Sequence, residues 1–374
     1  MAALPFYDAA AIGALNDQAV TLLKLFGARG YVREEPSVLQ PAEIFLDRSG
    51  EEIRRRTFCL TDPSGRELAL RPDLTIPICK HAVDSGAKFP ARLCYNGLAF
   101  RYQPNRPLRP TQFFQAGVEL LGLDDPAAGE SEILALAFES LRAVGIKDFE
   151  LRFGDLALFG ALVDALELPG SWRDRLKRNF WRAGYVETLL RRLGHGAVKA
   201  PSRADIEAQL NAETLAPPAG RTREDVIARA LERGAEAAAL RLDPAIVGAI
   251  TKLFGISGPV EEAMREIRAL LTAANIKLDG PLAVMDARLK TIASLGLDLS
   301  RVRFTAHFGR NLEYYTGFVF ELWSRDAEGA VQVAGGGRYD TLMESLGTKM
   351  PVSAIGCALR TERLLAARKF AGVA

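Results

Sequence analysis

Residues that build disulfide frameworks and metal sites are scarce in this sequence. It has four cysteines and three histidines among 374 residues. No two cysteines stand in a C-x-x-C spacing and no two histidines lie one helical turn apart, so neither a zinc site nor a thioredoxin-type centre is supported. We therefore expect no metal and no cofactor, and we expect the cysteines to be buried thiols. These cysteines are Cys59, Cys79, Cys94 and Cys357.

An excess of charge of either sign is also missing. Lys and Arg number 48 and Asp and Glu number 46, a net charge of +2, so no global field attracts nucleic acid or an anionic membrane. No apolar run approaches the ~18 residues of a membrane span, and residues 1–8 have no basic segment before an apolar stretch. The sequence therefore predicts a cytoplasmic, globular protein of about two or three domains.

The beginning of the chain predicts a helix followed by an edge strand. Asp8 can cap a helix that carries an apolar stripe through Phe26, and Gly27 and Gly30 can end it. Residues 31–36 then form an extended edge segment that ends at a proline.

Strand-like runs without helices between them dominate the next part of the sequence. Residues 57–60 and 68–70 flank a turn sequence at 62–65, which predicts a hairpin. Residues 92–101 and 112–121 are two further strand-like runs, joined by a proline-rich loop. Such hairpins are typical of an antiparallel sheet rather than of βαβ units.

In the later part of the chain, the residue pattern changes from strand-like to helical and then back to strand-like. Helical spacing covers 126–144, and residues from about 156 to 275 are rich in Ala, Leu, Arg and Glu with Pro/Gly breaks. Strand signals return at 302–306, 317–323 and 332–334. We therefore predict an α+β fold in three segments: a core at residues 1–164, a helical insertion domain at 165–275, and the rest of the core at 276–374.

Asp73 and Thr75 follow a predicted strand, in the sequence Leu70-Arg71-Pro72-Asp73-Leu74-Thr75. Their carboxylate and hydroxyl oxygens can accept hydrogen bonds from an amino group. The same two residues are typical of a helix N-terminus, with Asp73 as the cap. Both interpretations stay open, and the spacing alone favours the cap.

Gln115, Gly117 and Glu119 share one face of a predicted strand, because side chains alternate along a strand. Polar residues on such a face line a cleft or face solvent, and Gly117 allows a ligand to approach the backbone. Arginines in and near the preceding loop can bind a phosphate or a carboxylate through their forked donors. For an isolated stretch, a solvated sheet face is the simpler interpretation.

Two later segments are also candidates for a ligand-binding site. In the run Gly309–Gly317, the adjacent residues Tyr314 and Tyr315 are expected to point to opposite sides of a strand. One would then pack in the core while the other offers a hydroxyl to a pocket. The glycines at 335–337 allow a close backbone approach to a ligand, but they lack the spacing of a dinucleotide site.

A basic helical run with aromatic residues lies at residues 173–182. Such a run can bind RNA, but Asp174 interrupts it and the whole chain is nearly neutral. A solvated or protein-binding face is therefore favoured.

In this order, the clusters resemble the catalytic domain of histidyl-tRNA synthetase, a class II aminoacyl-tRNA synthetase. The helix and strand that end at Pro36 are similar to class II motif 1, Phe100–Glu119 to motif 2 and Gly356–Leu365 to motif 3. Arg310–Tyr315 and Gly335–Asp340 are similar to two signatures of the histidine enzymes. The resemblance implies a mixed, mainly antiparallel sheet flanked by helices, a helical insertion between motifs 2 and 3, and a two-fold homodimer built on motif 1.

Several residues depart from the synthetase pattern at positions that serve ATP. Motif 2 has Gln103 where the family has an acidic residue, and prolines stiffen the loop that carries Arg109. Motif 3 has Arg360 where the family has a glycine. Only 11 residues follow Arg363 (374 − 363), so no anticodon-binding domain is expected. We therefore regard Gln103, Arg109, Arg360 and Arg363 as positions of a degraded ATP site.

The residues that match the amino-acid half of the synthetase site are retained. The resemblance implies that they bind histidine: Asp73, Thr75, Arg101, Gln115, Glu119, Arg310, Tyr314 and Tyr315. Asp73 stands where the family has a glutamate. This combination is similar to the family of ATP phosphoribosyltransferase regulatory subunits. That family implies a non-catalytic protein that assembles with a short-form catalytic subunit and transmits histidine feedback in the first step of histidine biosynthesis.

Two other classes of function remain open. Arg101, Arg310 and Arg363 support a truncated histidyl-tRNA synthetase or another ATP-dependent aminoacyl-adenylate-forming enzyme, because arginines stabilise charge at a transferring centre. The basic run at 173–182 is the only support for an RNA-binding module. Neither nucleic acid nor a membrane is an expected partner.

Overall fold

The structure is a computed structural model that describes most of the chain. The described residues are 6–46, 53–103, 109–166, 168, 170–180, 186, 188–190, 202–212, 222–239, 244–308 and 314–373. They divide into two compact units. One unit comprises residues 1–162, 257–264 and 278–374, and the other comprises residues 163–256 and 265–277. The predicted insertion domain at 165–275 stays a prediction.

A nine-stranded sheet runs through the described part of the first unit. Its strand order is β1-β5-β6-β12-β11-β10-β7-β9-β8. All neighbouring strands pair antiparallel except β1 with β5 and β7 with β9, so the predicted α+β fold with a mainly antiparallel sheet is confirmed. The strands are β1 (Val32–Arg33), β5 (Ala91–Phe100), β6 (Gln112–Leu121), β7 (Glu150–Asp155), β8 (Ser257–Pro259), β9 (Val302–Thr305), β10 (Phe318–Asp326), β11 (Gly329–Arg338) and β12 (Ala354–Arg360).

Helix α1 (Ala9–Ala28) forms as its sequence predicts. The side chain of Asp8 accepts a hydrogen bond from the backbone N–H of Ala11 at 2.8 Å, which satisfies one of the free donors of the first turn. Leu15, Leu22 and Phe26 are buried along one stripe. Burial of this stripe, rather than intrinsic helix propensity, supplies most of the stability of such a helix.

The predicted hairpin is also confirmed. Strands β3 (Phe58–Thr61) and β4 (Glu67–Leu70) pair antiparallel, and β2 (Leu39–Pro41) completes a three-stranded sheet in the order β2-β4-β3. Asp62 orders the turn by accepting hydrogen bonds from Ser64 and Arg66. The expectation of four buried thiols is wrong at Cys59, which is exposed because it lies in β3, an edge strand of this small sheet.

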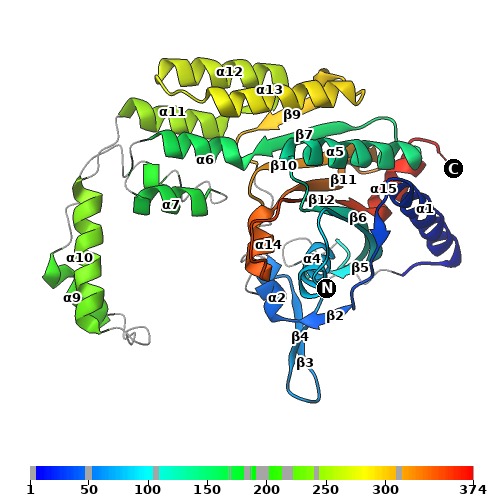
Figure 1. Ribbon diagram of the computed structural model, residues 1–374, viewed down its shortest axis with the longest axis horizontal. Helices are drawn as coiled ribbons and strands as arrows, with labels where there is room; N and C mark the ends of the chain where they lie inside the picture. The colour runs from blue at the N-terminus through cyan, green and yellow to red at the C-terminus, as the bar shows by residue number, and fades with distance from the viewer. Residues whose placement is uncertain are drawn as a thin grey trace. The chain divides into compact units, whose positions relative to one another are not determined.

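The two faces of the large sheet are covered differently (Figure 1). Helix α5 (Pro126–Ala143) packs on one face, where Gly129 lies close to Leu120 of β6 and Ile355 of β12. Helix α1 and helix α15 (Thr361–Phe370) also pack with this layer. Because side chains alternate along a strand, Glu119 and Gly356 face the other side. On that side lie α2 (Glu43–Leu46), α4 (Thr75–Asp84) and α14 (Asp340–Leu346), which share one apolar core.

Helices make up most of the remaining described chain. The second unit contains α7 (Gly170–Arg178), α9 (Arg203–Ala212), α10 (Arg223–Ala239) and α11 (Pro244–Gly255). Its apolar contacts include Phe180 and Phe254, whose rings are 5.4 Å apart. The other helical segments are α6 (Leu156–Ala165), α12 (Val260–Ala273), α13 (Asp279–Ser294) and the 3-10 turn Leu299–Arg301. Within the described ranges, no helix combines the length and the apolar character needed to cross a bilayer.

Candidate functional site

A small cavity of about 30 Å³ lies between the sheet and helices α4 and α14. The structure brings together here the predicted histidine-pocket residues that it describes: Asp73, Thr75, Arg101, Gln115, Glu119, Tyr314 and Tyr315. Arg310 lies outside the described residues. Further lining residues come from β11, β12 and the start of α14: Gln332, Gly335, Tyr339, Gly356, Cys357 and Arg360.

Glu119 of β6 is the centre of a buried hydrogen-bond network. Its Oε1 accepts hydrogen bonds from the Thr75 hydroxyl at 2.7 Å and from the Tyr95 hydroxyl at 3.1 Å. Its Oε2 accepts a hydrogen bond from the Tyr339 hydroxyl. Burial raises the pKa of Glu119 to about 7, although these three donors favour the ionised form. The carboxylate is therefore poised to change charge near neutral pH.

Two glycines make room for this network. A Cβ at position 356 would overlap Oε2 of Glu119, and a Cβ at position 117 would overlap the phenol of Tyr95. Gly117 was expected to admit a ligand to the backbone, and this expectation is wrong because the Tyr95 ring occupies that space. The solvated interpretation of the Gln115 and Glu119 face is also wrong, since both side chains are 1% exposed.

Asp73 has two distinct oxygens. Oδ1 accepts a hydrogen bond from the backbone N–H of Ile76 at 3.1 Å, so the side chain does serve the first turn of α4. Oδ2 is buried and has no hydrogen-bond partner among the described residues. The capping and the ligand-binding interpretations of Asp73 are thus compatible, one for each oxygen.

Gln115 offers a second unpaired acceptor in the same cavity. Its Nε2 donates to the Tyr95 hydroxyl at 3.2 Å, whereas its Oε1 is buried without a hydrogen-bond partner among the described residues. An unpaired buried acceptor costs about 1–3 kcal/mol. Two such oxygens that line one cavity indicate a place for a ligand with several N–H donors.

Two arginines occupy the end of the cavity near Gln115. The guanidinium carbon of Arg360 lies 4.4 Å from the centre of the Phe113 ring, and that of Arg101 lies 5.6 Å from it. Arg101 also donates from Nε to the backbone carbonyl of Pro72 at 2.6 Å. Arg360 was assigned to the ATP site from sequence, but its side chain lines the same cavity as the histidine-pocket residues.

Tyr314 and Tyr315 do not alternate along a strand, as their sequence was expected to do. Neither lies in a strand, their ring centres are 4.9 Å apart, and both line the cavity. The alternation rule fails here because it applies only to extended, paired backbone. The ring of Tyr314 also packs edge-on against the ring of Tyr339, with 5.8 Å between ring centres, and both residues line the cavity.

The other residues assigned to a degraded ATP site do not line this cavity. The side chain of Gln103 accepts a hydrogen bond from Arg56, Arg109 is exposed, and Arg363 donates to the backbone carbonyl of Gln332 at 2.9 Å. The loop residues 104–108 and the aromatic residue Trp181 of the basic run lie outside the described residues.

Sequence reasoning missed Tyr95 and Tyr339 as site residues. Both are fully buried, and burial together with nearby Glu119 raises the pKa of each hydroxyl well above its ordinary value. Tyr95 had a signal in the sequence, because it lies on β5 opposite Gly117, where a bulky residue faces a glycine. For Tyr339, the only signal in the sequence was its position shortly after the glycines at 335–337.

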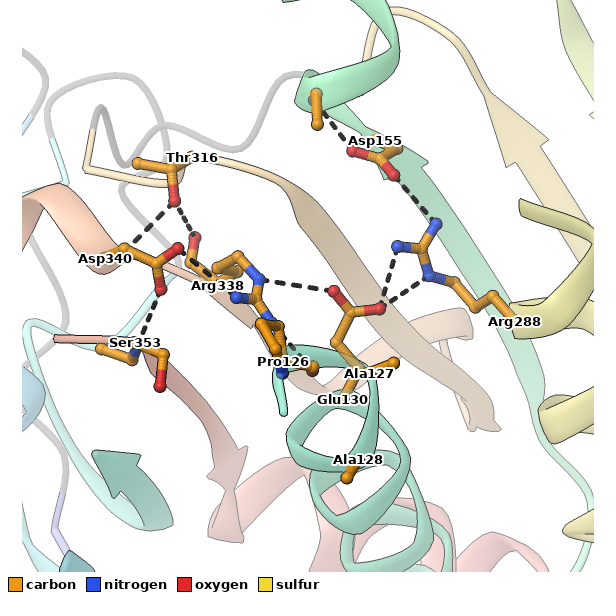
Figure 2. A network of polar contacts seen from close by, with 12 residues as sticks. Pro126, Ala127, Ala128, Glu130, Asp155, Arg288, Thr316, Arg338, Asp340 and Ser353 are labelled. Carbon is orange, nitrogen blue, oxygen red and sulfur yellow. Dashed lines mark hydrogen bonds and ion pairs between the residues drawn. The ribbon is translucent and has the colours of Figure 1, made fainter. Parts of the chain in front are cut away.

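A second polar network anchors the chain on both sides of Tyr339 (Figure 2). Glu130 of α5 bridges Arg288 of α13, at 2.9 Å, and Arg338, at 3.4 Å. Arg288 also contacts Asp155 at 2.9 Å, and Arg338 contacts Asp340 at 3.4 Å. Because Arg338 and Asp340 flank Tyr339, this network fixes the segment that carries the Tyr339 hydroxyl to Glu119.

Comparisons with known proteins agree with this arrangement. The model of the histidyl-tRNA synthetase family matches residues 8–364. Proteins named ATP phosphoribosyltransferase regulatory subunit are similar over nearly their whole length. The one from Chelativorans sp. is 36% identical, with 94% of this chain and 97% of the relative covered. The one from Rhizobium meliloti is 34% identical, with 92% and 94% covered.

Solved structures support the same fold. A protein from Bacillus halodurans, described as an ATP phosphoribosyltransferase regulatory subunit/histidyl-tRNA synthetase, superposes with a TM-score of 0.67 at 22% identity, covering 97% of this chain and 81% of that one. A histidine–tRNA ligase subunit from Alicyclobacillus acidocaldarius gives a TM-score of 0.59 at 23% identity, covering 98% and 96%. The fold and the sequence identities together show that the chain belongs to the histidyl-tRNA synthetase-like family of ATP phosphoribosyltransferase regulatory subunits.

Proposed function

We propose that this protein is the non-catalytic regulatory subunit of an ATP phosphoribosyltransferase and serves the first step of histidine biosynthesis. We further propose that it binds free L-histidine in the cavity between Asp73 and Glu119 and so transmits feedback to a short-form catalytic subunit. The observation that carries the ligand proposal is the pair of unpaired buried acceptors, Asp73 Oδ2 and Gln115 Oε1.

The α-ammonium group of an amino acid fits these acceptors. An ammonium carries three N–H donors and no acceptor. Asp73 Oδ2 and Gln115 Oε1 can take two of them, and the negative charge of Asp73 strengthens its bond. Because the two oxygens are already desolvated, the ligand regains hydrogen bonds that folding left unmade.

Glu119 suits the imidazole end of the ligand. A carboxylate offers about four acceptor positions, and the hydroxyls of Thr75, Tyr95 and Tyr339 use three. One position remains for an imidazole N–H. The cavity of about 30 Å³ has room for only two or three waters by this measure, since one water needs ~10–15 Å³. Histidine binding therefore requires lining side chains to move apart.

Aminoacyl-adenylate formation is not part of the proposal. The side chain of Gln103 accepts a hydrogen bond from Arg56. Arg360 lines the cavity together with Arg101, where an adenylate would add a bulky group next to the amino acid. A pyrophosphate-exchange assay with histidine and ATP tests this point. Exchange at a rate typical of a synthetase would replace the regulatory proposal with that of a truncated synthetase.

We also propose that the protein forms a homodimer and binds the catalytic subunit. If histidine changes the affinity of the two proteins for each other, that assembly must change histidine affinity by the same factor, with a coupling free energy of about 1–3 kcal/mol. Relatives named regulatory subunit are similar over nearly their whole length, which supports the binding of a catalytic subunit.

The decisive experiment is a calorimetric titration of L-histidine into the protein, with and without the catalytic subunit. Asp73→Asn removes the charge next to the ammonium and keeps the Oδ1 acceptor for α4, so we expect about 10- to 100-fold weaker binding. Asp84→Asn, on the exposed side of the same helix, is the matched control. Equal affinity in wild type and Asp73→Asn would contradict the site, and no binding by the folded wild type would contradict the ligand.

A further inference from the structure

Arg360 lines the cavity of the proposed histidine site, although the sequence assigned it to an ATP site. It is the last residue of β12 and pairs in register with Gln115 of β6. Its guanidinium stacks on Phe113, which is also the ring beside the guanidinium of Arg101. Arg101 directly follows β5, the strand on the other side of β6. Two positive groups from the two neighbours of β6 are therefore held at one end of the cavity.

Both charges act on Asp73. Burial raises the pKa of the Asp73 carboxyl above its ordinary value, and the positive charges of Arg101 and Arg360 oppose that rise. This end of the cavity thus combines an unpaired carboxylate oxygen with two guanidinium groups. A group that is itself zwitterionic, with an ammonium and a carboxylate on one carbon, matches this pair of opposite charges.

The register of the strands shows where the cavity-lining residues lie along β6. Arg360 lies opposite Gln115, and Gly356 lies opposite Glu119, four residues further along both strands. At ~3.3 Å per residue, the two ends are about 13 Å apart along the backbone. The arginines therefore lie at the end with Asp73 and Gln115, and the Glu119 network lies at the other.

We infer that Arg360, together with Arg101, binds the α-carboxylate of the amino-acid ligand and makes the cavity selective for a free amino acid over the same side chain without its carboxylate. This inference rests on the proposed histidine site and names the residue that binds the α-carboxylate of the ligand. Arg360 is then a binding residue of the cavity and not a remnant of an ATP site.

The test compares two ligands and three proteins by calorimetric titration. L-Histidine carries the carboxylate, and L-histidinol has an alcohol in its place with the same ammonium and imidazole. Arg360→Met keeps a long side chain on Phe113 but removes the charge. Lys369→Met removes an exposed charge from the following helix and is the matched control.

We expect wild type and Lys369→Met to bind histidine at least about tenfold more tightly than histidinol, since a charge-assisted hydrogen bond is lost with the alcohol. Arg360→Met should bind histidine about 10- to 100-fold more weakly and bind histidinol within about threefold of wild type. Arg360→Lys retains the charge without the fork and should fall between the two.

Three results would overturn the inference. If Arg360→Met weakens both ligands equally, Arg360 only supports the fold, and if it weakens neither, Arg360 does not bind the ligand. In both cases the histidine proposal survives, because wild type still binds histidine. If folded wild type binds neither ligand, the histidine proposal fails as well. Thermal unfolding of each variant shows whether it is folded, and Arg360→Lys replaces Arg360→Met if the latter is not.

Discussion

The carboxylate of Glu119 lies directly on the backbone of Gly356. The two residues pair in register across β6 and β12, and a Cβ at position 356 would lie 2.6 Å from Cδ of Glu119. Only glycine at this position lets the carboxylate lie over the β12 backbone and accept hydrogen bonds from Thr75 and Tyr339.

Gly356→Ala should displace Glu119 and disrupt the pocket. Overpacking of this kind costs about 1–3 kcal/mol of unfolding free energy, and the neighbouring backbone of Val118 limits relief. Urea unfolding measures the loss, and histidine titration should show weaker binding. Gly258→Ala, in strand β8 with open space around it, is the control and should change neither property. Wild-type binding by Gly356→Ala would show that Glu119 has no fixed place in the site.

Glu119→Gln should change how stability depends on pH. The pKa of Glu119 is about 7 in the folded protein against 4.5 ordinarily, so its stabilising contribution is complete below pH 4.5 and is lost as pH rises to 7. The loss amounts to about 3 kcal/mol. Glutamine has no such titration, so the variant should gain stability relative to wild type between pH 5 and pH 8.

Urea unfolding at several pH values and one protein concentration measures this difference. Asp73 is buried, its pKa is also raised, and its charge raises the pKa of Glu119, so the difference between the two proteins reports Glu119 together with its coupling to Asp73. Glu344→Gln, an exposed change on α14, should follow the wild-type profile. Parallel profiles for wild type and Glu119→Gln would rule out the raised pKa.

Glu130→Gln should destabilise the protein because Glu130 forms ion pairs with the buried Arg288 and the partly buried Arg338. The side chains of Arg288 and Arg338 are 5% and 12% exposed. Removing one member of a buried ion network typically costs about 3 kcal/mol. Asp84→Asn, which breaks an exposed pair with Lys80, should have no measurable effect in the same unfolding assay. An equal, small effect of both changes would mean that the network contributes little.

The protein should be a homodimer at micromolar concentration. Val20 of α1 and Val32 of β1 are 65% and 62% exposed, in the region that resembles motif 1, and a partner would cover them. Light scattering should give twice the chain mass, and Val32→Asp should shift the protein toward monomer. A wild-type monomer under these conditions would refute this interface.

Local features of the sequence sufficed for much of the fold. The cap at Asp8, the stripe through Phe26 and the turn at Asp62 each depend on residues a few positions apart, and each formed as predicted. The strand limits of β6 were also predicted. Strand β7 was not predicted, although its apolar residues Leu151 and Phe153 alternate with the charged residues Glu150 and Arg152, a pattern typical of a strand.

The ordered motifs also indicated the family, which the comparisons confirm. They indicated the residues that gather at the cavity, but not their geometry. Sequence alone left the Gln115 and Glu119 face undecided between solvent and cleft, misplaced the tyrosine pair, and missed Tyr95 and Tyr339.

The sequence by itself determined that Gln115 and Glu119 share a strand face and that residues 9–28 form a helix, since both follow from short-range periodicity. Only the tertiary structure decided what that face meets. Thr75 and Tyr339 reach Glu119 from 44 and 220 residues away, and Arg360 pairs with Gln115 across two strands. Such contacts depend on strand order and packing between distant segments, and these long-range contacts set the charge and shape of the cavity.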